Sequence, residues 1–124
     1  MRKQYHFRPS ERGLKAWDVD RLVALSSEFP RIQVPLAAIR EIDEPYWSTD
    51  DGPVTCRTFV EHLSLIQEAD LDYPIILSSD GRVMDGMHRV AKALLRGNDY
   101  IDAVRFVTDP EPDHVGISPN DLPY

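Results

Sequence analysis

Cysteine is almost absent from the sequence. Cys56 is the one cysteine among 124 residues, so the chain cannot form an internal disulfide. This usage fits a protein of a reducing compartment. Long apolar runs are missing too: no segment approaches the roughly 18 apolar residues of a membrane-spanning helix. The basic N-terminus is not followed by the apolar run of a signal peptide. We therefore expect a cytoplasmic protein with no membrane segment.

Positive charge is also scarce. The chain has 14 Lys and Arg residues against 21 Asp and Glu residues, and its formal net charge is -7. Nucleic-acid-binding proteins present a basic face to the phosphate backbone, so this balance disfavours nucleic acid as a partner. Several basic residues nevertheless lie within residues 1–16, which leaves a local contact through this segment open.

The length and the 42% hydrophobic content fit one globular domain. We expect a single domain over residues 1–124. It consists of a basic N-terminal segment (1–16), a folded core (17–107) and an acidic, proline-rich C-terminal tail (108–124). The tail either lies on the surface or packs along the domain or a partner through its apolar residues. These residues are Val115, Ile117, Leu122 and Tyr124.

Hydrophobic periodicity predicts three helices and four short strands. The helices cover residues 18–29, 55–70 and 87–97, and the strands cover residues 31–36, 73–78, 82–84 and 101–107. Asp18 and Thr55 are expected to cap the first two helices, and Gly97 to end the third. Asp80-Gly81 predicts a hairpin turn. The pattern indicates an α+β fold with a small mixed sheet and three helices.

The segment "PIILSSDGRVMDGMHRVAKALLRG" brings a glycine, a histidine and an arginine to the start of the third helix. The first amides of a helix have no intrahelical partner, and the helix dipole gives them partial positive charge. Gly86 allows a ligand to approach the backbone, and Arg89 adds a planar fork that suits phosphate. We expect an anion site formed by Asp85, Gly86, Met87, His88 and Arg89. The alternative is an ordinary turn in which Asp85 caps the helix and Arg89 is solvated.

This order of elements resembles the core of the ParB/sulfiredoxin-like superfamily, which includes the ParB-like nuclease domain. The shared features are "VPLAAIRE", a strand containing Pro-Ile, a hairpin, Asp-Gly-x-His-Arg opening a helix, and the strand "IDAVRF". They cover residues 32–107. Sulfiredoxins carry a nucleophilic cysteine where this chain has Met87, and Cys56 lies in another helix, so we reject sulfiredoxin activity. The partitioning ParB proteins carry an arginine-rich motif here, which this chain lacks.

Within this superfamily, the nearest chemical resemblance is to the free serine kinases. It implies that the Asp85–Arg89 segment binds the phosphates of ATP or another nucleotide, and that Asp85 holds Mg²⁺. The implied activity is that of a phosphotransferase or ATPase acting on a small-molecule or protein substrate. The acidic loop "REIDEPYW" would supply the general base. The candidates for this base are Glu44, Asp43 and Glu41.

Two other functions remain open at this point. One is a non-enzymatic module that binds nucleic acid or a partner protein. The other is a nuclease whose metal is held by Asp85 and Glu44. The alternative interpretation of the acidic loop itself is a solvated surface.

Four residues outside the corner also bear on the site. Tyr46 and Trp47 either stack on a nucleobase or cover the core. His62 is expected to pack rather than to bind a ligand. Arg57 lies in the first turn of its helix, where the dipole disfavours a cation, and this position is a hint that it faces an anion or a carboxylate.

Overall fold

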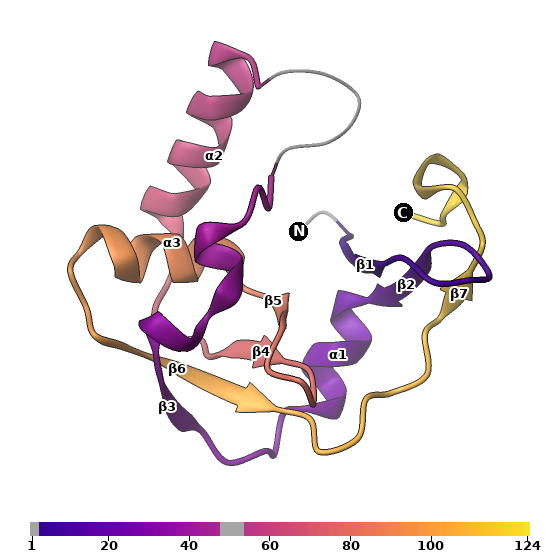
Figure 1. The fold of residues 1–124 in the computed structure, drawn as a ribbon, viewed down its shortest axis with the longest axis horizontal. Helices are drawn as coiled ribbons and strands as arrows, with labels where there is room; N and C mark the ends of the chain where they lie inside the picture. Colours follow the sequence, from indigo (N-terminus) through magenta and orange to yellow (C-terminus); the bar gives the residue numbers. More distant parts are fainter. Residues whose placement is uncertain (1–2, 48–53) are drawn as a thin grey trace.

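A computed structural model describes residues 3–47 and 54–124 of the chain (Figure 1). Its central sheet consists of β3 (Ile32–Pro35), β4 (Ile75–Leu77), β5 (Val83–Asp85) and β6 (Tyr100–Arg105). The strand order is β3-β6-β4-β5, with β6 antiparallel to β3 and parallel to β4. The sheet is therefore mixed, as predicted. The β4–β5 hairpin turns at Asp80-Gly81, also as predicted.

The described residues form three helices, α1 (Val19–Leu25), α2 (Cys56–Glu68) and α3 (Met87–Leu95). Asp18 and Thr55 cap α1 and α2 by accepting hydrogen bonds from backbone amides, which confirms both predicted caps. α1 is shorter than predicted, and the buried hydroxyl of Ser26 donates to the Leu22 carbonyl at its end. Short 3-10 helices cover Leu36–Ala38, Arg40–Asp43 and Pro119–Asp121. Within the described ranges, no helix has the length and apolarity needed to cross a bilayer.

The two faces of the central sheet pack against different helices. Ile75 of β4 belongs to a buried cluster with Val90 of α3. The next residue, Ile76, points to the other face and joins a cluster with Leu22 of α1. All three residues of β4 are buried, as its unbroken apolar run predicts.

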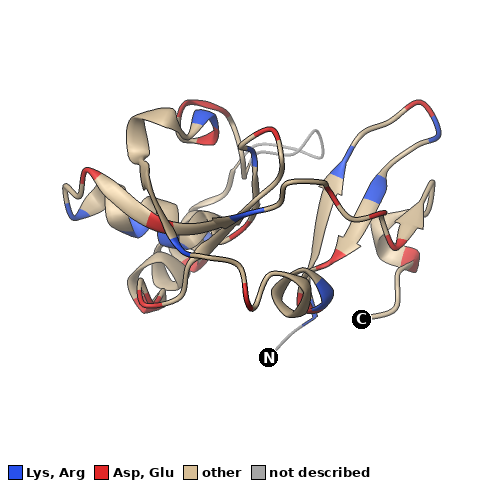
Figure 2. Ribbon diagram, turned by 90° about the horizontal axis from the view of Figure 1, so that it is seen from below, with Lys and Arg blue, Asp and Glu red and all other residues tan. Residues whose placement is uncertain are grey.

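A second sheet was not expected from the sequence. Its strands are β1 (Tyr5–Arg8), β2 (Lys15–Asp18) and β7 (His114–Val115), in the order β1-β2-β7. Figure 2 shows it beside the central sheet, with α1 at the junction. The predicted boundary between residues 16 and 17 falls inside β2.

The C-terminal tail packs along the domain instead of lying free on the surface. β7 pairs with β2, and the Asp113 carboxylate accepts a hydrogen bond from the Asp18 amide. Of the apolar tail residues, Leu122 is buried, whereas Val115, Ile117 and Tyr124 are exposed. The tail is thus attached through backbone pairing, through hydrogen bonds that involve side chains, and through one buried apolar side chain.

A polar network joins β1 to the turn of the β4–β5 hairpin. Arg8 Nη2 donates to Ser78 Oγ at 2.8 Å, and Arg8 Nη1 lies 3.3 Å from Asp80 Oδ2. Hydrogen bonds, the first of them from the Ser78 hydroxyl, hold the pKa of Asp80 well below its usual range. His6 lies beside this network, against Trp17. Burial, and then the charge of Arg8, lowers the pKa of His6 to about 4.

The lowered pKa of His6 makes stability depend on pH. An unfolded histidine binds a proton below about pH 6.5, whereas folded His6 does so only below about pH 4. The unfolded state therefore binds more protons between these values, and the free energy of unfolding falls as the pH falls through this window. We expect His6→Gln to flatten this slope, measured by urea unfolding at a series of pH values.

The comparison at about pH 8, where histidine is neutral in both states, gives the packing cost of the His6 substitution alone. If the His6→Gln protein loses stability with falling pH as steeply as the wild type, His6 is not the group responsible.

Candidate functional site

The corner between β5 and α3 brings the five predicted anion-site residues together. β5 ends at Asp85, Gly86 has a φ of 103°, and α3 begins at Met87. Among residues 3–47 and 54–124, no side chain caps the first turn of α3. The expectation that Asp85 caps this helix is therefore wrong, and the amides at its start carry no side-chain acceptor.

Asp85 binds Arg89 instead. Arg89 Nη2 lies 3.1 Å from Asp85 Oδ2 and 3.3 Å from the carbonyl oxygen of Pro74. Both side chains are about 20% exposed, so this ion pair is largely buried. Arg89 Nε is buried and has no hydrogen-bond partner within the described residues. The interpretation of Arg89 as a solvated side chain is wrong.

Met87 and His88 have different roles at the start of α3. The Met87 side chain belongs to the core cluster beneath the sheet, so it is the backbone of this residue that faces the corner. His88 Nε2 lies 3.0 Å from His62 Nδ1 on α2. Burial is the main cause of the lowered pKa of His88, and the charges of His62 and Arg89 act in the same direction.

Trp47 covers this histidine pair. Its ring is stacked on His62 and on His88, with ring centroids 4.8 Å apart in each case. Tyr46 lies edge-on to Trp47 at 5.8 Å. His62 is packed, as predicted, but it also binds a residue of the corner. No local pattern predicts that contact, because 26 positions separate the two histidines.

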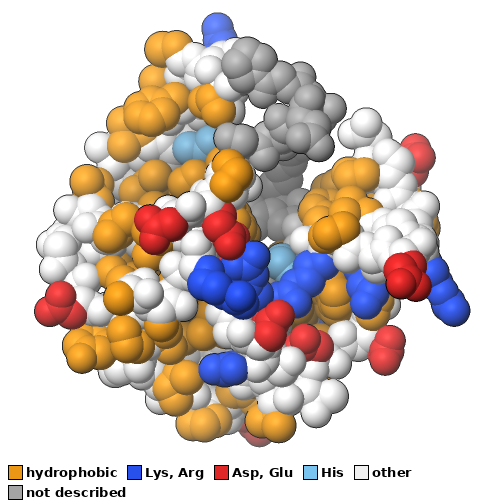
Figure 3. All heavy atoms as spheres, viewed as in Figure 1, with side chains coloured by type: hydrophobic (Ala, Val, Ile, Leu, Met, Phe, Trp, Pro, Cys, Tyr) orange, Lys and Arg blue, Asp and Glu red, His pale blue; other side chains and the backbone are white. Residues whose placement is uncertain are grey.

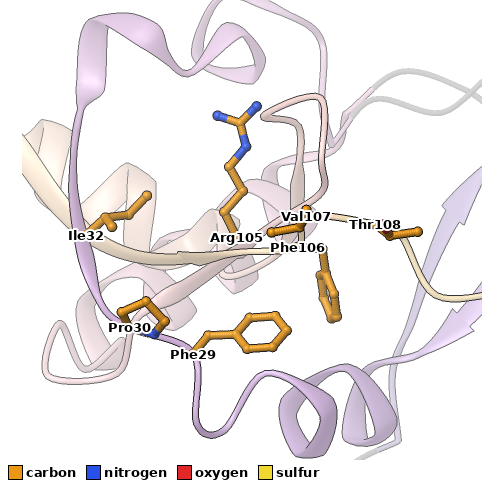
Figure 4. A pocket seen from close by; sticks show the side chains of 7 residues that line it. All are labelled: Phe29, Pro30, Ile32, Arg105, Phe106, Val107 and Thr108. Atoms are coloured by element: carbon orange, nitrogen blue, oxygen red, sulfur yellow. The ribbon is translucent and has the colours of Figure 1, made fainter.

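A cleft of about 1160 Å³ opens beside the corner, and its lining includes all of Asp85–Arg89. Tyr46 and Trp47 line it too, and the other walls come from β1, α1, the end of α2 and residues 73–74. A smaller groove of about 390 Å³ between Phe29 and Phe106 contains none of the predicted site residues (Figure 4). The large cleft is therefore the candidate site.

The structure does not bring the acidic loop into this cleft. Glu41 is buried, and its carboxylate accepts a hydrogen bond from the Val83 amide. Glu44 forms an ion pair of 2.9 Å with Arg82, and Asp43 is exposed. Figure 3 shows acidic and basic side chains next to one another in the middle of this face. None of the three carboxylates lines the cleft.

The corner does not fit a metal site built by protein side chains alone. No group of three or more His, Cys, Asp or Glu residues gathers within residues 3–47 and 54–124. Asp85 is the one acidic residue of the corner, and it is paired with Arg89. We therefore derive no step through Mg²⁺.

Comparisons of the chain with protein-family models, with curated proteins and with solved structures gave no match. The resemblance to the ParB/sulfiredoxin-like superfamily rests on the order of motifs in the sequence and stays a prediction.

Substitution of Gly86 tests whether Arg89 packs as closely against residue 86 as the structure shows. A Cβ on residue 86 would lie 2.7 Å from Arg89 Nη2 and 2.7 Å from Ile75 Cγ2. Gly97 also has a positive φ, of 75°, but a Cβ there would meet nothing within 4 Å. Left-handed strain of about 1–2 kcal/mol applies to alanine at both positions, and overlap adds about 1 kcal/mol or more at residue 86. We expect Gly86→Ala to lower the free energy of unfolding more than Gly97→Ala. Equal losses in urea unfolding would contradict the close packing of Arg89.

Substitution of Glu41 tests whether the acidic loop stabilises β5. Glu41→Ala leaves the buried Val83 amide without an acceptor, which costs about 1–3 kcal/mol of stability. The matched control Asp43→Ala changes an exposed residue of the same turn, so its effect is expected within about 0.5 kcal/mol. Thermal or urea unfolding measures both. A Glu41→Ala protein as stable as the wild type would show that this carboxylate does not support β5.

Proposed function

We propose that the protein binds the phosphate groups of a nucleotide, such as ATP, in the cleft at the start of α3. One observation carries the proposal: the uncapped first turn of α3 shares this cleft with Arg89. Free amides and the positive end of a helix dipole favour an anion. The anion would replace the acceptor that Asp85 does not provide.

The guanidinium group of Arg89 supports phosphate over other anions. Its Nη2 atom is the nitrogen that binds Asp85 and Pro74, while its Nε has no partner among the described residues. A buried guanidinium with unused donors is suited to bind oxygens of a phosphate group in a fixed orientation. Its ion pair with Asp85 holds the side chain in place before a ligand arrives.

The aromatic residues of the cleft support a nucleotide over inorganic phosphate. Tyr46 and Trp47 line the same cleft as Arg89. Stacking of a nucleobase on an aromatic side chain contributes roughly 1–3 kcal/mol. The cleft volume of about 1160 Å³ exceeds the roughly 300–1,000 Å³ of typical small-molecule sites, so it has room for a whole nucleotide.

Phosphoryl transfer has less support than binding. The candidate bases Glu44, Asp43 and Glu41 lie outside the cleft lining, and Arg82 already pairs with Glu44. The proposal is accordingly nucleotide binding, with transfer to a substrate as the finer hypothesis. The nuclease alternative, which joins Asp85 to Glu44, has no specific observation in its favour.

Arg89→Lys tests the phosphate site. The lysine keeps the positive charge but loses the planar fork, so we expect ATP affinity to fall about tenfold or more in calorimetric titration. Arg96→Lys is the matched control at the other end of α3, and it should bind ATP like the wild type. Titration with inorganic phosphate and with adenosine separates the contributions of the phosphate and the base. Equal affinities of the two lysine variants would overturn the assignment.

Asp85→Asn in the same titration distinguishes direct phosphate contact from contact through a metal, because the two predict opposite changes in affinity. If the phosphates contact Arg89 and the amides directly, removing the nearby negative charge strengthens the binding of ATP without magnesium. If Asp85 instead holds a metal, Asp85→Asn weakens the binding of Mg-ATP. Loss of affinity for metal-free ATP in this variant would argue against direct phosphate contact at the corner.

A further inference from the structure

His6 of β1 lines the cleft but takes no part in the proposed phosphate site. Arg8 Nε donates a hydrogen bond to His6 Nε2 at 3.3 Å, and the ring of Trp17 lies against the imidazole with ring centroids 5.6 Å apart. Arg8 in turn donates to the buried hydroxyl of Ser78. Trp17 Nε1 donates to the carbonyl of Pro110. Both neighbours of His6 are therefore anchored, and the position of the imidazole is fixed before a ligand binds.

The hydrogen bond from Arg8 decides which nitrogen of His6 carries the proton. A guanidinium group is only a donor, so the Nε2 atom that accepts from it is unprotonated. The single proton of the neutral ring is then on Nδ1. Burial, and then the charge of Arg8, lowers the pKa of His6 to about 4, so the ring is neutral at physiological pH. His6 thus presents a fixed, uncharged N–H donor.

The Nδ1 donor of His6 is open to the cleft. Within the part of the chain that the structure describes, the one hydrogen bond of the His6 ring is the bond from Arg8. Among the described residues, the buried side-chain nitrogen and oxygen atoms without a partner are Glu41 Oε1 and Arg89 Nε. Nδ1 is not one of them, so it reaches the molecular surface. That surface is the wall of the cleft, because His6 belongs to its lining.

The surroundings of His6 suit an uncharged ligand group. Three other lining residues belong to the same buried apolar cluster as Trp17, and these are Ile76, Met84 and Val104. A few polar groups among apolar side chains are typical of small-molecule sites, in which the polar groups fix the orientation of the ligand. A ligand that covers Nδ1 must provide an acceptor, because a buried N–H group without one weakens binding. The edge of a nucleobase provides such an acceptor on an uncharged ring.

We infer that His6 Nδ1 donates a hydrogen bond to the base of the nucleotide in the cleft, and that this bond selects a base with an acceptor at the contacted edge. The inference rests on the proposed function, because it requires a nucleotide in the cleft. Stacking on Tyr46 or Trp47 uses the face of a base, whereas a hydrogen bond uses its edge. The two kinds of contact therefore do not compete for the same atoms.

Arg8 gives the contact its selectivity. A neutral histidine without this neighbour can carry its proton on either nitrogen, so its Nδ1 can accept as well as donate. Arg8 prevents the exchange, because a proton on Nε2 would face the guanidinium N–H. An exocyclic amino group placed at Nδ1 would meet a second donor, whereas a ring nitrogen such as N7 of a purine is an acceptor. The site therefore favours a base that presents a ring nitrogen or a carbonyl oxygen to β1.

Two substitutions of His6 separate its donor from its acceptor. The asparagine amide lies as many bonds from Cβ as Nδ1 does, so His6→Asn keeps a donor there and removes the acceptor of Arg8. The glutamine amide lies as many bonds from Cβ as Nε2 does, so His6→Gln keeps that acceptor and removes the donor. Histidine is neutral at about pH 8, where we expect His6→Gln to bind ATP roughly threefold to tenfold more weakly in calorimetric titration. His6→Asn should bind ATP nearly like the wild type.

His114→Gln is the matched control, because His114 lies in β7 of the same sheet and outside the cleft lining. It should bind ATP like the wild type, and circular dichroism confirms that each variant folds. A His6→Gln protein that binds ATP as tightly as the wild type contradicts the inference. So does a loss of affinity in His6→Asn that equals or exceeds the loss in His6→Gln, because His6 would then act by supporting Arg8.

Titrations with adenosine and with inorganic tripolyphosphate distinguish a failure of this inference from a failure of the phosphate site. His6→Gln should weaken the binding of adenosine and leave that of tripolyphosphate unchanged, whereas Arg89→Lys should do the reverse. Weaker tripolyphosphate binding in His6→Gln would place the phosphates at β1 and refute the base contact. A wild type that binds ATP no more tightly than tripolyphosphate, and does not bind adenosine, refutes the base contact but not phosphate binding. A wild type that binds none of the three overturns both proposals.

Discussion

The guanidinium group of Arg89 lies against residue 86, at a position where any side chain on that residue would collide with it. This close approach determines the corner between β5 and α3. Gly86 turns the chain, and the turn brings Asp85 back onto Arg89. The N-cap position of α3 is occupied by Gly86, which has no side chain, and the carboxylate of the preceding Asp85 pairs with Arg89, so neither residue provides an acceptor for the first amides of the helix. An ordinary strand-to-helix corner would satisfy those amides internally. Here the same ion pair that stabilises the corner leaves the helix start available to an anion.

Local signals predicted the parts of the fold that neighbouring residues make. The caps at Asp18 and Thr55 and the turn at Asp80-Gly81 depend on side chains and backbone angles within a few positions, and all three are present. The second sheet depends on pairing between distant segments. Trp17 Nε1, for example, donates to the Pro110 carbonyl, 93 positions away. No periodicity over a few residues contains that information, so the basic segment and the tail could not be placed from the sequence.

The candidate site also divides into residues that local patterns predicted and residues whose surroundings depend on distant segments. The residues of the corner adjoin one another in the sequence, and the motif predicted their grouping. The acidic loop could not be resolved in this way, because a 3-10 turn places Glu41 inside and Asp43 outside although two positions separate them. Burial there is decided by the Val83 amide and by Arg82, which belong to the hairpin that follows much later. Three carboxylates that look equivalent in the sequence therefore have three different surroundings.

α2 connects the corner to the outer surface of the molecule. Its inner side contributes His62 to a hydrogen bond with His88, and its outer side carries the exposed side chains of Phe59, Val60 and Leu63. A hydrogen bond between two imidazoles needs at least one neutral ring, which agrees with the lowered pKa of His88. α2 reaches the central sheet mainly through α3, and His62 is held over the corner by its contacts with His88 and Trp47. The part of the cleft wall formed by Leu65, Glu68 and Ala69 therefore depends on the packing of α2 against α3.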